Sequence, residues 1–327
     1  MKRIAVVGAG IMGCATAWAL SARGGDVTVY EQFDLDHDRG SSHGRTRIVR
    51  LSYPDAGWVR LARESMDGWR ELEADAEQEL LGLYGIVELA PRREMTSARG
   101  LDACGVEYTW LDADGARALG AALPNGWIAL LQPEAGIVRA DLARHAFLDV
   151  ARGRGVRVEA GRRIDSLDDL DADVVVVTTG WWIRELVPDV PVTVTRETVC
   201  YFRREGQPAP AIVELDEITR GHGMYSLYDP VHGLKAGEHH RGPVAEPNGD
   251  GAPDPASVAR VSAWVASRLP TVEPEPIAAE TCPYTSTADG SFVLERRGRI
   301  VVGSACSGHG FKFAPLVGRR LADLTLQ

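Results

Sequence analysis

A hydrophobic strand pattern, a glycine-rich turn and a helix pattern follow one another at the start of the chain, and this run constrains the fold more than any other segment. Residues 3–8 have the pattern of a buried strand, the turn that follows matches GxGxxG, and Asp26–Tyr30 has the pattern of a second strand. Gly8 permits a tight turn, Gly10 a close approach of the backbone to a pyrophosphate, and Gly13 close packing of the helix on the strand. The segment therefore predicts a βαβ unit that binds a dinucleotide at the N-terminus of its helix.

Glu31 stands directly after the second strand, eighteen positions beyond Gly13. An acidic side chain at that place accepts hydrogen bonds from the ribose of adenosine and repels a 2′-phosphate. Strand, helix, second strand and acid occur in register, which predicts an adenine dinucleotide. An NAD-dependent dehydrogenase accounts for residues 1–31 but for none of the later motifs.

The composition argues against several classes of protein. The formal net charge is −10, so the surface repels nucleic acid and anionic membranes, and we expect neither as a partner. No run of about 18 uninterrupted apolar residues occurs, which argues against a membrane span. The five cysteines are scattered without a CxxC pair, so we expect no metal site, no disulfide framework and a cytoplasmic location.

The rest of the chain alternates between two kinds of pattern. Helix patterns cover 58–81 and 140–153, and a strand over 174–177 ends in a Thr-Thr-Gly turn, whereas 192–228 is rich in strand patterns. We therefore predict a two-domain protein of the α/β (α+β) class, with a Rossmann-like nucleotide domain and an inserted mixed β-sheet domain for the substrate. The nucleotide domain comprises 1–82, 136–190 and 290–327, and the inserted domain comprises 83–135 and 191–289.

A second glycine-rich turn lies near the end of the chain. Ser307–Phe313 stands between a strand pattern over 300–302 and a helix pattern over 316–322. Such a turn brings backbone N–H groups close to an anionic or electron-rich ligand, and Lys312 adds a mobile cation. Taken alone, the segment equally fits an ordinary left-handed turn with a surface lysine.

Taken together, the motifs resemble the monomeric sarcosine oxidase and N-methyltryptophan oxidase group of the D-amino-acid-oxidase-like flavoproteins. They occur in the family's order and span nearly the whole chain. SGHGFKF and HGxTRIxR are specific to the group, whereas GxGxxG is not. Arg45 departs from the pattern, because an acid or a neutral residue is expected there. The matching segments are GAGIMG (8–13), GSSHGRTRIVR (40–50), GIV (136–138), TTG (178–180), GLKAGEH (233–239), CPYT (282–285) and SGHGFKF (307–313).

The resemblance implies an FAD cofactor that is attached covalently to a cysteine through a thioether. Cys282, in the CPYT motif, stands at the position of that cysteine. Cys306, just before SGHGFKF, is a rival thiol, and a dissociable FAD beside two buried structural cysteines is the other alternative. The resemblance places the cofactor contacts at Gly8, Gly10, Ile11, Met12, Gly13, Glu31, Ser42, Thr46, Arg47, Ile164, Thr179, Gly180, Trp182, Cys282, Gly308, His309, Gly310 and Lys312.

The reaction that the resemblance implies is oxidation of a small secondary amino acid. A hydride equivalent passes from the C–H bond next to nitrogen to flavin N5, the iminium hydrolyses, and O2 reoxidises the flavin to give hydrogen peroxide. The substrate carboxylate needs a cationic clamp, which Arg50 offers as a bidentate donor and Lys312 as a point charge. A buried salt bridge is the alternative role of Arg50. Tyr225 and Tyr284 are expected to line the substrate cavity, with core packing as their alternative.

Four residues are expected to act on the flavin or on oxygen. Lys235 matches the lysine that holds a water under flavin N5, where its charge lowers the energy of superoxide. The resemblance places Arg47 over the flavin ring and His43 near it, where a cation stabilises the reduced flavin. A loop-capping histidine is the alternative role of His43. His239 is expected to donate a hydrogen bond to the substrate or to tune its amine proton.

The sequence leaves the substrate and the electron acceptor open. N-methyl amino acids, cyclic imino acids and a specialised biosynthetic amine all fit. An FAD-dependent dehydrogenase with another acceptor and a non-catalytic flavin-binding protein are the alternative functions. The joint presence of Arg50, Lys235, Cys282 and Lys312 argues against the last of these, and the family implies a monomer.

Overall fold

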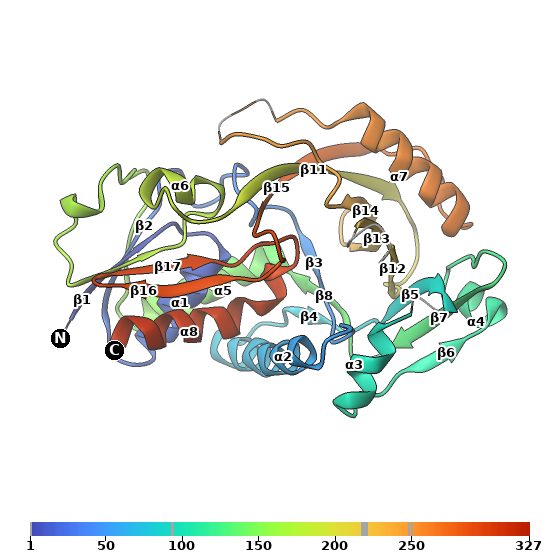
Figure 1. The fold of residues 1–327 in the computed structure, drawn as a ribbon, viewed down its shortest axis with the longest axis horizontal. Coiled ribbons are helices and arrows are strands. Elements are labelled where there is room, and N and C mark those ends of the chain that lie inside the picture. The colour runs from blue at the N-terminus through green and yellow to red at the C-terminus, as the bar shows by residue number, and fades with distance from the viewer. Residues whose placement is uncertain (1, 93–94, 217–221, 248, 250) are drawn as a thin grey trace.

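A six-stranded sheet forms the part of the molecule that holds both termini (Figure 1). The computed structural model describes the whole chain except residues 1, 93–94, 217–221, 248 and 250. All pairings in this sheet are parallel apart from that of β16 with β17. Across the sheet the order is β16 (Val293–Arg297), β17 (Ile300–Ser304), β10 (Val174–Val177), β1 (Arg3–Val7), β2 (Asp26–Tyr30) and β9 (Arg157–Glu159).

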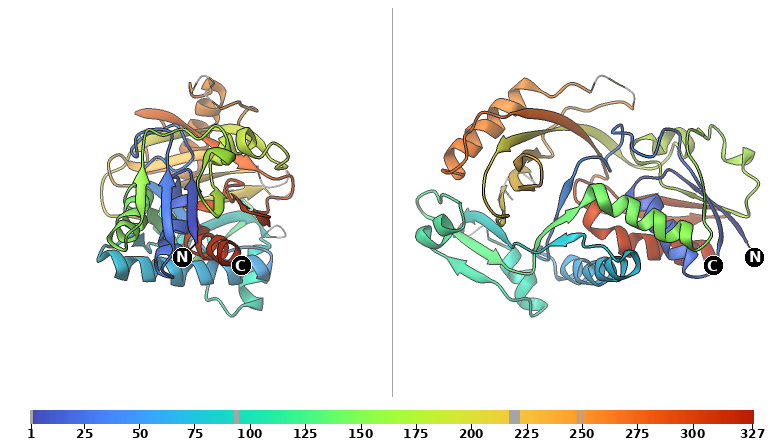
Figure 2. Two further views of the ribbon diagram at one scale, coloured as in Figure 1. Left: turned by 90° about the vertical axis from the view of Figure 1, so that its left-hand side faces the viewer. Right: turned by 180° about the vertical axis from the view of Figure 1, so that it is seen from behind.

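The central strands of this sheet supply two separate cores, because successive side chains of a strand point to opposite faces. Ile4 and Val6 of β1 pack with the helices of one face. Ala5 and Val7 pack on the other face with the segment that carries α6 (Ile183–Leu186). The helices of the first face lie together in both views of Figure 2 and are α1 (Ile11–Ser21), α2 (Ala56–Ala76), α5 (Ala140–Gly153) and α8 (Ala314–Leu326).

Helix α1 begins directly at the glycine turn and is buried along its whole length. It packs against α5 and α8 as well as against the sheet. A Cβ at Gly318 of α8 would lie 2.5 Å from the backbone of Ala15, so this glycine permits the close approach of the two helices. The packing holds the N-terminus of α1 at the carboxyl end of β1, which is the edge where doubly wound sheets bind their ligands.

The other half of the molecule is built on an eight-stranded sheet in which every pairing is antiparallel except that of β12 with β5. Two segments of the chain contribute to it, and α3 (Ser97–Ala103) and α4 (Ala113–Ala118) lie within the first. The order is β15 (Ala278–Ser286), β11 (Thr193–Arg203), β14 (Gly233–His239), β13 (His222–Asp229), β12 (Ala211–Asp216), β5 (Ile86–Pro91), β7 (Trp127–Gln132) and β6 (Thr109–Leu111).

Helix α7 (Pro255–Arg268) covers one face of the eight-stranded sheet. Asp254 caps the start of the helix, because its side chain accepts hydrogen bonds from the N–H groups of the first turn. The apolar stripe of the helix includes Val261 and Val265, which are fully buried in a core with Phe202 of β11. The opposite face of the sheet carries Tyr225, Leu227 and Lys235, which line a cavity.

A small antiparallel sheet lies between the two halves (Figure 1). Its strands run in the order β3 (Thr46–Val49), β8 (Gly136–Arg139) and β4 (Leu81–Gly82). The remaining regular elements are short 3₁₀ helices, η2 (Leu167–Asp169), η3 (Gly180–Trp182) and η4 (Gly310–Phe313).

The predicted mixed α/β fold with a Rossmann-like sheet is confirmed, whereas the predicted domain boundaries stay a prediction. One helix differs from its predicted range, because α2 ends at Ala76 instead of residue 81. Glu77 adopts the left-handed conformation, with a φ of 49°. The Glu73 carboxylate then accepts hydrogen bonds from the N–H groups of Leu80 and Leu81, which turns the chain into β4.

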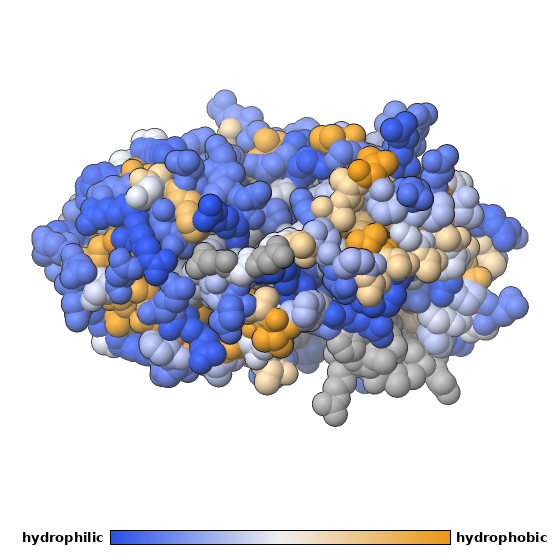
Figure 3. Space-filling model, turned by 90° about the horizontal axis from the view of Figure 1, so that it is seen from above, coloured by the Kyte–Doolittle hydropathy of each residue, from blue (hydrophilic) through white to orange (hydrophobic). Residues whose placement is uncertain are grey.

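Hydrophilic side chains dominate the face shown in Figure 3, and hydrophobic ones are scattered over it. Large exposed hydrophobic residues in the described part of the chain include Trp110 on β6 and Val231 and Val244, which lie in two different loops. None of the helices in the described ranges is long and apolar enough to cross a membrane.

Candidate active site

A cavity of about 550 Å³ is lined by residues from both large sheets. Its wall includes the turn after β1, the loop before β3, the end of β10, parts of β13, β14 and β15, and the turn before α8. Every residue predicted from the sequence to form the site lines this cavity, with the exception of Gly13. A Cβ at Gly13 would lie 1.9 Å from the carbonyl oxygen of Gly8, so Gly13 serves the packing of α1 on the turn.

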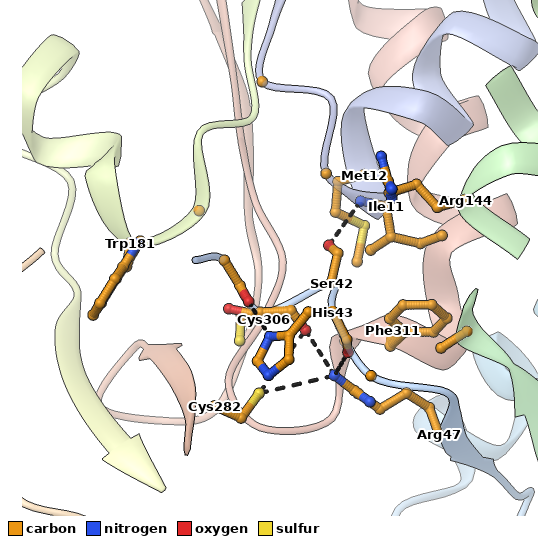
Figure 4. Close-up of a pocket in the computed structure, with 18 of the residues that line it drawn as sticks. Ile11, Met12, Ser42, His43, Arg47, Arg144, Trp181, Cys282, Cys306 and Phe311 are labelled. Carbon is orange, nitrogen blue, oxygen red and sulfur yellow. Dashed lines mark hydrogen bonds between the residues drawn. The ribbon is translucent and has the colours of Figure 1, made fainter. Parts of the chain in front are cut away.

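The turn between β1 and α1 is shaped for close contact with a ligand. Gly8 has a φ of 98°, and a Cβ there would lie 2.7 Å from a carbonyl oxygen that follows β10. Ser42 accepts a hydrogen bond from the Ile11 N–H at 2.9 Å (Figure 4). Glu31 accepts one from the Ala9 N–H at 2.9 Å, which ties the second strand to the turn. The helix N-terminus therefore faces the cavity with its positive dipole end.

Four buried polar atoms in the cavity wall have no hydrogen-bond partner among the residues that the structure describes. They are Oγ1 of Thr46, Oγ1 of Thr179 and the indole nitrogens of Trp181 and Trp182. An unpaired buried polar group costs roughly 1–3 kcal/mol, so most buried polar side chains in folded proteins have a hydrogen-bond partner. Together with the glycine turn, these atoms fit a dinucleotide cofactor whose polar groups complete their hydrogen bonds.

Arg47 organises the loop that precedes β3. Its guanidinium donates hydrogen bonds to the carbonyl oxygens of Ser41 and His43 at 2.9 and 2.6 Å, and to that of Thr46 at 2.9 Å. One nitrogen also lies 3.9 Å from Sγ of Cys282 (Figure 4). Because its hydrogen-bond acceptors are neutral carbonyl groups, the Arg47 guanidinium keeps an uncompensated positive charge, half-buried at the cavity wall.

Two cysteines face the cavity, Cys282 on β15 and Cys306 before the second glycine turn. Burial raises the pKa of the Cys282 thiol, while the charges of Arg47 and Lys235 act against that rise. Cys306 accepts a hydrogen bond from the Thr285 N–H at 3.4 Å. Cys282 therefore has two cations beside it that stabilise its thiolate form.

Five polar residues gather where β14 and β15 meet the Arg47 loop. The Nζ of Lys235 lies 3.9 Å from Oε1 of Glu280, and that same oxygen lies 3.9 Å from Nε2 of His43. The hydroxyl of Tyr201 donates a hydrogen bond to Glu280. Burial and the charge of Arg47 lower the pKa of Lys235 to about 8 and keep the pKa of His43 below its ordinary value. We call this group the Lys235 cluster: His43, Arg47, Tyr201, Lys235 and Glu280.

The second buried lysine lies at another part of the cavity wall. The ammonium of Lys312 donates a hydrogen bond to the carbonyl oxygen of His309 at 2.8 Å, and it lies 5.9 Å from the ring of Tyr53. Two side chains of α2 donate hydrogen bonds to the Lys312 carbonyl oxygen and so fix its backbone. Burial, with the charge of Arg50 added, lowers the pKa of Lys312 well below its ordinary value. We call this group the Lys312 cluster: Arg50, Tyr53, His239, His309 and Lys312.

Arg50 has a carboxylate partner of its own. Its Nη1 lies 2.7 Å from Oε1 of Glu88, which is 4% exposed. Glu88 also accepts hydrogen bonds from the hydroxyls of Ser52 and Ser97. The buried salt bridge that the sequence allowed for Arg50 is therefore present, and Arg50 also lines the cavity. Glu88 was not predicted, because nothing in its strand pattern distinguishes a buried acid from a solvated one.

His239, Tyr225 and Tyr284 form an aromatic wall of the cavity. The rings of His239 and Tyr284 lie 5.6 Å apart. Tyr225 lies across Gly237, because a Cβ there would lie 2.8 Å from the Tyr225 hydroxyl oxygen. Burial lowers the pKa of His239 and raises the pKa values of both tyrosines, so all three side chains are uncharged at neutral pH.

The sequence analysis missed Glu280 and left Arg45 unexplained. Glu280, Cys282 and Tyr284 alternate along one strand, which places them on the same face, and this period was a usable signal. Arg45 forms two hydrogen bonds with the buried Asp229, at 2.9 and 3.1 Å. The departure at position 45 is thus matched by an acid on β13, and the pair fixes the loop against the sheet.

Lysine is rare in this chain, and two of its three lysines line the cavity. Among 36 lysines and arginines, lysine occurs only at positions 2, 235 and 312. Lys235 and Lys312 are 3% and 8% exposed on the cavity wall. Arginine cannot replace them in kind, because lysine offers a compact charge whose pKa shifts readily on burial. A count of lysines in the amino-acid sequence is therefore a signal that singles out both residues.

Known proteins are similar to this chain in both sequence and fold. The model of the family described as FAD dependent oxidoreductase matches residues 3–324. Human peroxisomal sarcosine oxidase is 31% identical over 358 residues, covering 98% of this chain and 91% of that protein. Monomeric sarcosine oxidase of Streptomyces avermitilis is also 31% identical, covering 99% and 93%. The open form of NikD, an unusual amino acid oxidase essential for nikkomycin biosynthesis, matches with a TM-score of 0.86 at 26% identity, covering 100% of this chain and 95% of that one.

Proposed function

The chain belongs to the FAD-dependent oxidoreductase family, as its motifs predicted, and from this premise we propose that it is an oxidase of a small secondary amino acid. The proposed substrate carries an N-methylated or cyclic amine next to the C–H bond that is oxidised. Bound FAD supplies the redox chemistry, in which a hydride equivalent leaves the substrate and O2 becomes hydrogen peroxide. The names of the related sarcosine oxidases support the N-methyl class, because sarcosine is N-methylglycine.

One observation carries the proposal: a single cavity joins the glycine turn to two buried lysines that have different neighbours. Arg50 and Lys312 would bind the substrate carboxylate by charge-assisted hydrogen bonds. The same charges would lower the pKa of the substrate amine and favour its neutral form, which transfers a hydride without a separate base. His239, Tyr225 and Tyr284 would enclose the amine and exclude water.

Lys235 would serve the oxygen half of the reaction. Its ammonium would stabilise the negative charge that develops on oxygen, in a site where burial strengthens the interaction. Arg47 would stabilise the reduced cofactor, and His43 would shape the loop beside it through its contact with the Gly40 carbonyl at 2.5 Å. The residues present fit FAD, because the turn, the unpartnered polar atoms and this cationic group line the same cavity.

Cys282 is our candidate for a thioether bond to the FAD. The thiolate is the nucleophilic form, and the cations beside Cys282 offset part of the rise in its pKa that burial causes. The new bond would replace the thiol S–H and one C–H of the flavin, and the two electrons released would pass through the flavin to O2. We expect flavin to remain on the acid-precipitated protein and on the Cys306→Ser variant, and to be released from Cys282→Ser. Retention of flavin by acid-precipitated Cys282→Ser would assign the bond to another residue.

The function is tested by a screen of secondary amino acids with the purified yellow protein. We expect an N-methyl or cyclic amino acid to bleach the flavin absorbance without air and to release hydrogen peroxide in air, with the matching primary amino acid as control. Bleaching without peroxide would identify a dehydrogenase with another acceptor. A flavin that no amino acid bleaches would identify a non-catalytic binding protein.

The segments 1–82, 136–190 and 290–327 are proposed to hold the FAD, and 83–135 and 191–289 to cover the substrate. The position of the glycine turn on the six-stranded sheet supports this division. A monomer is proposed as well, in line with the name of the Streptomyces relative. The five unpaired cysteines suit a reducing compartment such as the cytoplasm. Sedimentation velocity would test the monomer.

A further inference from the structure

Glu280 is the acidic member of the Lys235 cluster, and it lies outside every motif that carries the family resemblance. It stands on β15, two residues before Cys282. Its side chain is one-third exposed (33%) on the cavity wall, and one of its oxygens lies 3.9 Å from the Lys235 ammonium. The Tyr201 hydroxyl holds this oxygen by a hydrogen bond. The carboxylate is thus fixed in place beside a buried lysine.

Asp229, a second acid near Lys235, is already paired with another cation. Asp229 is fully buried and accepts two hydrogen bonds from Arg45. It also accepts hydrogen bonds from the N–H groups of Val231 and His232, at 3.1 and 2.8 Å. Its charge is therefore matched by Arg45, and Glu280 is left as the counter-charge for the remaining cations.

The remaining groups that face Lys235 do not supply a negative charge. Arg47 adds a second cation, which is half-buried. Burial raises the pKa values of Tyr201 and Cys282, so both stay protonated at neutral pH. The pKa of His43 is lowered by burial and by Arg47, so its ring is neutral there. His232 packs against the ring of Tyr201, at 5.1 Å between centroids. Glu280 is therefore the largest of the charges that offset the charge of Lys235, ahead of Cys282 and Asp229.

A buried ammonium beside a guanidinium loses its proton more easily than one in water, because burial and like charge both disfavour the charged form. Both effects act on Lys235, and Glu280 acts in the opposite direction. We propose that Glu280 is a positioning residue for the oxygen half of the reaction, which keeps Lys235 protonated and holds its ammonium toward the cavity. The inference rests on the oxygen role proposed above for Lys235.

The chemistry of the oxygen step explains why the charge of Lys235 matters. Conversion of O2 to hydrogen peroxide takes two electrons and two protons; the reduced cofactor supplies both electrons and one proton, and solvent supplies the other. The Lys235 ammonium stabilises the negative oxygen during the transfer and is unchanged at the end. Loss of the Lys235 proton removes this stabilisation. Glu280 therefore sets the upper pH limit of the oxygen step and leaves substrate oxidation to other residues.

The rarity of lysine allows the charge state of Lys235 to be measured directly. Growth on lysine labelled with ¹³C at the ε-carbon gives signals from only three positions, 2, 235 and 312. The titration of these signals with pH is followed in the oxidised holoenzyme, and Lys235→Met identifies the signal of Lys235. The variants are Glu280→Gln and Glu280→Asp. The control is Glu295→Gln, which removes a carboxylate that pairs with Arg297 on β16, away from the cavity wall.

We expect the midpoint of the Lys235 titration to fall by about one pH unit or more in Glu280→Gln, because an opposite charge within 4–6 Å shifts a pKa by roughly 1–3 units. Glu280→Asp should recover part of the fall, and Glu295→Gln should leave the midpoint unchanged. In stopped-flow experiments, the pH at which reoxidation by O2 slows should fall in parallel, while anaerobic flavin reduction keeps its rate.

An unchanged midpoint in folded Glu280→Gln overturns the inference, and so does a shifted midpoint that the reoxidation profile does not follow. If Glu280→Gln does not fold, Tyr201→Phe replaces it: the carboxylate loses its anchor, and a smaller downward shift supports the inference, whereas no shift overturns it. The proposed function is judged separately. If Lys235→Met reoxidises as fast as the parent protein, the oxygen role of Lys235 fails whatever the titration shows.

Discussion

Two buried lysines share one cavity, and the groups beside them differ. Lys235 has the Glu280 carboxylate 3.9 Å from its Nζ. Lys312 donates to a backbone carbonyl oxygen, and its charged neighbour is the cation Arg50. The first lysine therefore has a counter-charge in the protein, whereas the proposed function supplies the second with one only through the bound substrate carboxylate. The difference teaches that burial alone does not set the charge of a lysine, because a neighbouring anion decides whether the ammonium is stable.

The largest expected effect tests the Lys235 cluster. Lys235→Met should slow reoxidation of the flavin by O2 by about 10²–10³-fold, which is the usual cost of removing one group that stabilises developing charge. Anaerobic reduction by the substrate should survive, because the Lys312 cluster is intact. Stopped-flow measurement of the two half-reactions separates these rates. Equal slowing of both would abolish the distinction between the two clusters.

The next effect tests the Lys312 cluster. Arg50→Ala should raise KM by roughly ten- to a hundredfold, because a hydrogen bond to a charged group contributes about 1.5–3 kcal/mol. The flavin should stay attached, as the visible absorbance will report. The single variant leaves Glu88 buried without its cation, which lowers stability.

The double variant Arg50→Ala with Glu88→Gln is the matched control for Arg50. It should recover most of the lost stability in thermal unfolding, because no unpaired charge stays buried. KM should remain high. If KM of the double variant returned to the parent value along with its stability, Arg50 would serve only the salt bridge.

The pH dependence should separate the clusters further. Lysine is charged below its pKa, and the pKa of Lys235 is about 8. Reoxidation should therefore be fastest below this pH and should fall by up to about tenfold per unit above it. The rate in Lys235→Met should be low and independent of pH over that range. A parent profile that stays level through pH 8–10, on the order of two units, would contradict the assignment.

Carboxylate binding should change the protonation of Lys312. An anion beside this ammonium raises the lowered pKa of Lys312. Binding of a carboxylate should therefore take up as much as about one proton, at pH values between the pKa values of Lys312 in the free and bound protein. Calorimetry with acetate in buffers of different ionisation enthalpy measures the uptake. Lys312→Met should abolish it, whereas Lys235→Met should preserve it. Uptake that survives in Lys312→Met would place the titrating group elsewhere.

The smallest effect concerns Gly44, which lies next to three members of the Lys235 cluster. Its φ is 81°, and a Cβ there would lie 3.3–3.5 Å from Arg47, Glu280 and Lys235. Gly44→Ala should cost about 1–2 kcal/mol of stability through the left-handed backbone and lower Tm by a few degrees. Gly24→Ala has a similar backbone cost with open space around it. We expect slower reoxidation of the flavin in Gly44→Ala and no change in Gly24→Ala. Equal reoxidation rates in the two variants would show that the Lys235 cluster tolerates the added methyl group.

Local patterns predicted much of the fold. The glycine turn, β2 and α5 follow from residues that are adjacent in sequence, and α5 spans the predicted range 140–153. The predicted end of α2 was wrong, because the side chain of Glu73 bonds to backbone groups beyond the helix. Motif resemblance placed the site residues in one cavity, while their individual roles stay predictions. Pairs such as Arg50 with Glu88 join segments that are far apart in the sequence, so no local pattern predicts that the two residues meet.

The amino-acid sequence by itself determined the dinucleotide turn, the family and the list of residues that gather at the cavity, because each depends on short runs with a definite spacing. Only the tertiary structure decided which charges are neighbours. Glu280 and Lys235 lie on different strands, and Arg50 follows β3 whereas Glu88 lies on β5. The strength of such pairs depends on distance and burial, which exist only after folding. The different charge environments of the two lysines are therefore a property of the packed sheets.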